Sequence, residues 1–216
     1  MSVPHSKNLK GLNLNLEDDE FEFFHEFNRD KVKSVIHLIT VELKERATGV
    51  EFLMIPFRPQ QTNENLLRML NAMFPQGNGQ PVTDAKLQKI VAHTEVHTLF
   101  QGLKYIWCRL EDGEVVGWRS YLQFKLREKI KNYPKKAFLE LMPQCLDSPS
   151  HASIVYDFFD LIVTISANSR VNKMSARKIS KMFVIWAFGK AVPNPSLADY
   201  DFDDKRTLPN NSFQDG

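Results

Sequence analysis

The chain has 216 residues, 43% hydrophobic and 11% aromatic, which is enough apolar material for one buried core. Its formal net charge of +2 is too small for the global basic field of a nucleic-acid-binding protein. Cys108 and Cys145 are too few for a disulfide framework, the N-terminus lacks the apolar core of a signal peptide, and no apolar stretch is long enough to span a membrane. We therefore expect a cytoplasmic protein with reduced thiols and no transmembrane segment.

The N-terminal quarter predicts a flexible arm and then a helix. Residues 1–17 are polar with isolated leucines and indicate the arm. Residues 17–27 join an acidic run to four phenylalanines, which predicts either a short aromatic helix docked on the core or a partner-binding motif. Asp30 is the expected N-cap of the first long helix, and residues 50–55 look extended before Pro56. The apolar face of that helix recurs at helical spacing at Val32, Val35, Ile36, Ile39 and Leu43.

The middle of the chain alternates helices with loops. Thr62 is the expected cap of a helix that ends before the proline- and glycine-rich loop 75–81, and Thr83 opens a short helix. Thr94 should cap a strongly amphipathic helix. Its apolar stripe is Val96, Leu99, Phe100, Leu103, Trp107 and Leu110, and its separate polar face is His97, Gln101, Lys104 and Cys108. Two further helices are expected at 116–127 and 137–146.

The C-terminal third contains the most apolar segment. Residues 151–167 are apolar nearly all round, which predicts the central buried helix. Ser175 is the expected N-cap of the last core helix, with Met174 and Ile179 as its hydrophobic staple. Residues 191–216 indicate a tail, or a linker to further parts of a longer protein.

These elements sum to an all-α domain of eight or nine helices over residues 18–190, with negligible strand. No glycine-rich phosphate-binding motif is present. His93 and His97 lack further ligands nearby, and Asp157 with Asp160 are better explained as core or edge acids than as catalytic groups. We therefore expect no metal and no cofactor.

Positive charge gathers at the start of the last helix, where the macrodipole is already positive. The run contains Arg170, Lys173, Arg177, Lys178 and Lys181. It is either a solvated surface or a binding face for an acidic partner, and the sequence alone leaves both interpretations open. Two other basic loci, Arg58 in a proline-bounded loop and Lys104 with Arg109, could join it in contacting phosphate or a GTPase switch surface.

Several of these segments resemble the RhoGAP domain over residues 30–190. The most specific likeness is Asn172-Lys173-Met174-Ser175-Ala176, and residues 35–58 and 96–110 also resemble family helices. The resemblance implies a RhoGAP-like helical fold and a Rho-type GTPase, or its regulators, as partner. It makes Arg58 the candidate arginine finger, and it implies a partner-binding face of Lys104, Arg109, Asn172, Lys173, Arg177, Lys178 and Lys181.

A closer resemblance is to the N-terminal region of fungal morphogenesis proteins first named as multicopy suppressors of a budding defect. It rests on residues 52–59, 103–110 and 168–185. It implies a role in cell polarity and bud emergence, polarity scaffold proteins as further partners, and recruitment to the bud tip or neck.

The chain also departs from the RhoGAP pattern. Pro56 and Pro59 flank the candidate finger where the family has glycines, and Cys108 and Lys178 stand where the family has arginine and asparagine. We therefore expect a binding or scaffolding domain without GAP catalysis. The alternatives are an active GAP that uses Arg58, and a pure adaptor that binds an acidic peptide or phospholipid headgroups.

Overall fold

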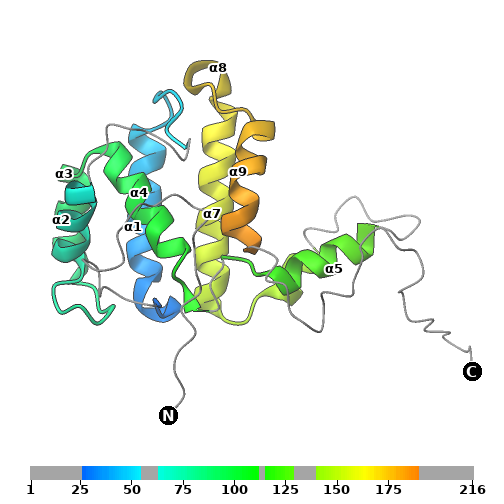
Figure 1. Cartoon of the computed structure of the whole chain (residues 1–216), viewed down its shortest axis with the longest axis horizontal. Coiled ribbons are helices and arrows are strands. Elements are labelled where there is room, and N and C mark those ends of the chain that lie inside the picture. Colours follow the sequence, from blue (N-terminus) through cyan, green and yellow to red (C-terminus); the bar gives the residue numbers. More distant parts are fainter. Residues whose placement is uncertain (1–25, 55–62, 112–114, 129–139, 190–216) are drawn as a thin grey trace, which may run out of the picture.

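The computed structural model describes residues 26–54, 63–111, 115–128 and 140–189. These residues form eight α-helices and a short 3-10 helix, with no strand among them (Figure 1). The elements are α1 (Arg29–Arg46), α2 (Asn63–Met73), α3 (Asp84–His93), α4 (Val96–Trp107), α5 (Trp118–Glu128), η2 (Met142–Cys145), α7 (Pro149–Ala167), α8 (Ser169–Asn172) and α9 (Ala176–Phe188). The all-α prediction is confirmed for this part of the chain. The predicted arm, the tail, Thr62 and Arg58 lie outside the described residues.

The domain is built around the contact of α1 with α7. The apolar face predicted for the first helix is confirmed, because Val32, Val35, Ile36, Ile39 and Leu43 are all fully buried. Helices α2 and α3 pack together against the α1 and α4 side, and α9 packs against α7 (Figure 1). Helix α5 contacts α9 and extends away from the bundle.

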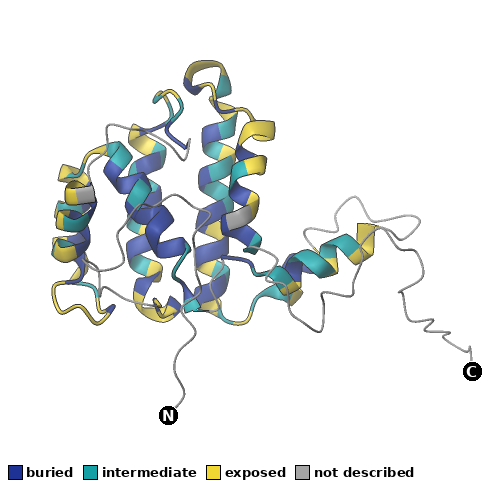
Figure 2. Ribbon diagram, in the orientation of Figure 1, coloured by how far each residue is buried: buried dark blue, intermediate teal, exposed yellow. Residues whose placement is uncertain are grey.

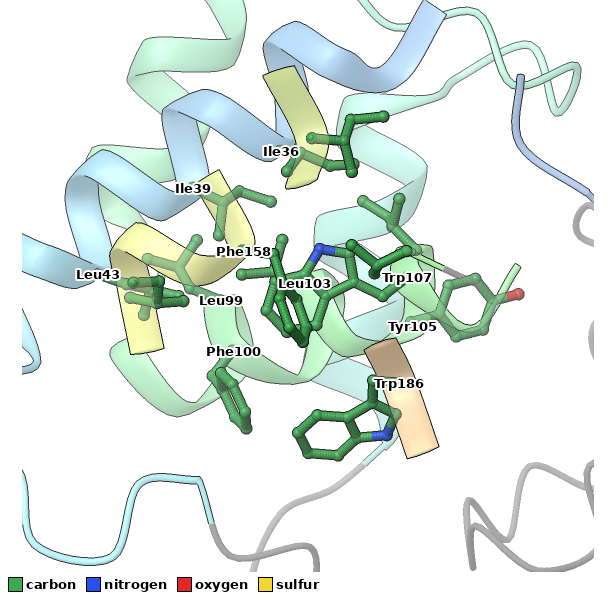
Figure 3. Packing of buried hydrophobic residues seen from close by; sticks show 14 of the residues in the cluster. Ile36, Ile39, Leu43, Leu99, Phe100, Leu103, Tyr105, Trp107, Phe158 and Trp186 are labelled. Carbon is green, nitrogen blue, oxygen red and sulfur yellow. The ribbon is translucent and has the colours of Figure 1, made fainter. Parts of the chain in front are cut away.

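The most enclosed helix is α4, and not the helix at 151–167 as predicted. From Thr98 to Trp107 every residue of α4 except Gln101 is buried. Figure 3 shows Trp107 of α4 beside Phe158 of α7, with ring centroids 4.8 Å apart. Helix α7 instead leaves Tyr156 69% and Val163 63% exposed. The helix is central, as predicted, because both α1 and α9 pack against it. Its burial is incomplete, because an apolar pattern does not say how many neighbours surround a helix.

Two helix caps differ by one or two residues from the prediction. Asn28, and not Asp30, caps α1, because its Oδ1 accepts from the backbone N–H groups of Asp30 (3.1 Å) and Lys31 (3.3 Å). Glu95, and not Thr94, caps α4, because its carboxylate accepts from Thr98 N at 3.0 Å. Asn28 and Asp30 are equally good caps by residue type. Thr94 instead closes α3, where its hydroxyl donates to the carbonyl of Ile90 at 2.7 Å.

The segment expected to be extended is a turn over residues 51–54. Phe52 has a left-handed φ of 55°, which is unusual for a residue with a Cβ. Its N–H donates to the carbonyl of Asn172 at 2.9 Å. The prediction was wrong because this turn is held by a contact with a segment far away in the sequence.

Candidate functional site

The connection between α8 and α9 has a defined local structure. Helix α8 ends at Lys173, whose φ of 62° reverses the chain. Ser175 then caps α9, since its hydroxyl accepts from Lys178 N at 3.4 Å. Met174 and Ile179 are both fully buried, as a hydrophobic staple requires. The predicted cap is therefore confirmed, and the staple stays a prediction with both of its residues buried.

Asn172 holds this connection to the rest of the domain. Its side-chain NH₂ donates to the carbonyls of Thr48 (3.0 Å) and Ile165 (2.8 Å), and its Oδ1 accepts from Met174 N at 2.8 Å. The residue is 0% exposed. The amide thus joins the ends of α1 and α7 to the turn before α9, and it is directed into the fold and not toward solvent.

Around this fixed turn lies a set of exposed cations, which we call the α8–α9 basic surface (Figure 2). No aspartate or glutamate occurs between Asp160 and Asp199. Within the described residues, no member of the set forms an ion pair. The α8–α9 basic surface consists of Arg170, Lys173, Arg177, Lys178 and Lys181.

Two lysines of the surface are oriented by the backbone. Lys173 Nζ donates to the carbonyl of Arg170 at 2.9 Å, and Lys178 Nζ donates to the carbonyl of Lys173 at 3.1 Å. Lys178 Nζ also lies 5.3 Å from the centroid of the Phe52 ring. Phe52 had not been identified from the sequence, because its contact with Lys178 depends on the packing of distant segments.

Lys104 lies away from the α8–α9 basic surface. It is 5% exposed, and its Nζ is 5.6 Å from the ring centroid of Trp186, in the last turn of α9 rather than the first. Burial lowers the pKa of Lys104. The polar face predicted for this helix is therefore wrong at Lys104, whose ammonium is covered by the core.

Arg109 also lies apart from the basic surface. Its guanidinium is 3.8 Å from the centroid of the Tyr105 ring, and one terminal nitrogen is buried without a hydrogen-bond partner. Of the predicted partner-binding residues, the structure therefore brings together Lys173, Arg177, Lys178 and Lys181, with Asn172 beneath them. Arg58 is outside the described residues.

Other side chains that are capable of acid–base or nucleophilic chemistry have structural roles. His37 Nδ1 is 3.0 Å from the buried carboxylate of Asp157, and Lys44 pairs with Asp160, so both acids join α7 to α1. Burial raises the pKa of the Cys108 thiol to about 11.

In the described part of the chain, no three histidine, cysteine or acidic side chains gather as metal ligands. Nor does any helix there have the length and apolar character needed to cross a bilayer.

Comparison with known proteins places the chain in a family. The family model "Meiotically up-regulated protein Msb1/Mug8 domain" matches residues 26–216. The chain belongs to the Msb1/Mug8 family. "Morphogenesis-related protein MSB1" of Saccharomyces cerevisiae is 63% identical over 219 residues, which cover 100% of this chain and 19% of that relative. The predicted resemblance to fungal morphogenesis proteins is thus confirmed at the level of the family.

No solved structure matches the chain. The likeness of the Msb1/Mug8 fold to a RhoGAP domain therefore stays a prediction from the sequence.

Proposed function

We propose that this Msb1/Mug8 domain acts in Rho-type GTPase signalling during morphogenesis, as a RhoGAP-like binding module without GAP catalysis. It binds a Rho-type GTPase or one of its regulators through the α8–α9 basic surface. The observation that carries the proposal is the exposure of all five cations on a segment that has no acidic residue. Polarity scaffold proteins at the bud tip or neck are further partners under this proposal.

The placement of the cations favours binding over simple solvation. The first turn of α9 already carries positive partial charge, so Arg177 and Lys178 in that turn are each locally unfavourable by a few tenths of a kcal/mol. Asn172 holds the turn rigid, so little conformational entropy is lost when an acidic partner binds. Surface charge of one sign also increases the rate of association with an oppositely charged partner.

Three positions argue against stimulation of GTP hydrolysis. GAP catalysis depends on an arginine finger and on groups that orient it and the nucleotide. Under the RhoGAP resemblance, Lys178 occupies the place of an asparagine and Cys108 the place of an arginine, and Lys104 is covered by Trp186. These differences support a domain that binds a GTPase without completing its active site.

A panel of Rho-type GTPases tests the proposal. Each is loaded with GTP or GDP, mixed with the full chain, and assayed for binding and for hydrolysis. We expect saturable binding, unchanged hydrolysis, and loss of binding in the charge-reversal variant Arg177→Glu/Lys181→Glu. The matched control is Lys86→Glu/Lys89→Glu, which reverses two exposed lysines of α3.

The outcomes separate the alternatives. Acceleration of hydrolysis that disappears in Arg58→Ala would show an active GAP. Absence of binding to every GTPase in either nucleotide state would leave a pure adaptor.

A further inference from the structure

Helix α8 forms one extremity of the domain. In Figure 1 it lies at the end of the bundle opposite to the start of α1. Val171 in this short helix is 57% exposed. Its neighbours Arg170 and Lys173 are exposed as well. A lone exposed valine is ordinary, but this one lies in the helix at the extremity of the bundle, with an exposed cation on either side of it in the chain.

The tip is also rigid. Val171 N donates to the carbonyl of Asn168 at 3.0 Å, and Lys173 N donates to the carbonyl of Ser169 at 3.0 Å. Asn172 fixes the turn from below through its three side-chain hydrogen bonds. Because these contacts hold the backbone, Val171 cannot turn inward to bury itself without breaking them.

We propose that this tip docks on an anionic lipid bilayer. Val171 enters the boundary between headgroups and acyl chains, and the α8–α9 basic surface contacts the lipid phosphates and carboxylates. The inference goes beyond the proposed function, because it needs no GTPase.

The shape and chemistry of the tip around Val171 suit a bilayer. A projecting end can meet a broad, flat anionic surface with Val171 and with the cations next to it in the chain, Arg170 and Lys173. Lysine and arginine can keep their charged ends at the headgroups while their aliphatic stems lie along the apolar boundary. Clusters of basic residues with an apolar anchor are a known basis of binding to acidic lipids.

The test is sedimentation of the full chain with vesicles. One set is phosphatidylcholine alone, and the other contains about 30% phosphatidylserine. We expect binding to the second set only, weakening as the salt rises from about 0.1 M to about 0.5 M because the charges are screened. A variant with Arg170→Glu and Lys173→Glu should bind at least about 25-fold more weakly, at about fivefold per cation.

The variant Val171→Ser tests whether the Val171 side chain enters the bilayer or whether charge alone holds the domain to the membrane surface. It should weaken vesicle binding about fivefold, because burial of an aliphatic side chain is lost. The matched control is Leu126→Ser, which removes a 48% exposed side chain on α5, remote from α8. That change should leave vesicle binding unaltered.

The proposal is overturned if the chain does not bind the anionic vesicles. It is also overturned if Val171→Ser binds them as well as the wild type does, or if an acidic protein binds the tip while vesicles do not. Binding of Val171→Ser to a GTPase in solution is measured in parallel and should be unchanged. Vesicle binding without any GTPase binding would refute the proposed function alone, and the reverse pattern would refute this inference alone.

Discussion

Replacement of Asn172 by alanine is the sharpest test of how the turn before α9 is held. In the wild type the side-chain amide donates to the carbonyls of Thr48 and Ile165 and accepts from Met174 N, and none of the residue is exposed. Alanine removes all three hydrogen bonds, and water cannot easily replace them at a fully buried position.

The expected loss follows from these three contacts. A buried hydrogen bond contributes about 1 kcal/mol net, so the free energy of unfolding should fall by about 3 kcal/mol. For a domain of this size that corresponds to a fall in Tm of about 10 °C. Asn172→Asp should cost more than alanine near neutral pH, because a carboxylate would face two carbonyl oxygens. That difference should shrink on acidification, since protonation restores one donor.

Urea denaturation followed by circular dichroism measures both changes. The matched control is Asn168→Ala, which removes an exposed asparagine amide that donates to the carbonyl of Thr164 at 2.9 Å. It should cost less than about 1 kcal/mol, because water can replace the lost donor. An equally small cost for Asn172→Ala would contradict the role assigned to Asn172.

Three further predictions concern single side chains. At pH 8 the thiolate fraction of Cys108 should be about 100-fold below that of an ordinary thiol, because burial raises its pKa to about 11. Alkylation by iodoacetamide, followed by mass spectrometry, should therefore be at least tenfold slower in the folded chain than in urea, and equal rates would contradict this. Burial lowers the pKa of Lys104. Below this lowered pKa the buried ammonium is charged, and its charge destabilises the fold. The destabilisation decreases as the pH rises toward 10.5, the ordinary pKa of lysine. Lys104→Met should raise the free energy of unfolding by roughly 1 kcal/mol at pH 7 and by less near pH 10, and a difference that grows with pH would refute the assignment. Ser175→Ala should lower the free energy of unfolding by about 0.5–1 kcal/mol, the lower part of the range for a cap, because the contact to Lys178 N is long at 3.4 Å. Ser175→Asp, which keeps a capping oxygen, should recover most of that loss in a thermal melt.

Local pattern was sufficient for much of the helical framework. The apolar spacing of the first long helix identified five residues that are all fully buried. The turn before α9 could also be predicted from the sequence, because a cap and a hydrophobic staple involve residues within five positions of one another. The cations of the α8–α9 basic surface could be found as a group for the same reason, since they follow closely along one segment.

Errors arose where the deciding contact was distant in sequence. Phe52 adopts a left-handed conformation in a turn whose N–H bonds to Asn172, and nothing local at residues 50–55 predicts this. Lys104 lies on a face that reads as polar, but Trp186 covers it. The pattern of α7 indicated full burial, although Tyr156 and Val163 face solvent.

The sequence by itself thus determined where most of the long helices lie, how α9 is capped, and that positive charge gathers at its start. It did not predict α8, and in the described part of the helix expected at 137–146 the structure has the 3-10 helix Met142–Cys145. These properties depend on spacing within a few turns, which the backbone geometry translates directly into faces and caps. Only the tertiary structure decided that Asn172 points inward, that Lys104 is buried apart from the other cations, and that Val171 lies exposed at the extremity. Exposure depends on which helices pack against a given face. That is set by contacts between segments far apart in the sequence, such as Asn172 with Thr48 and Lys104 with Trp186.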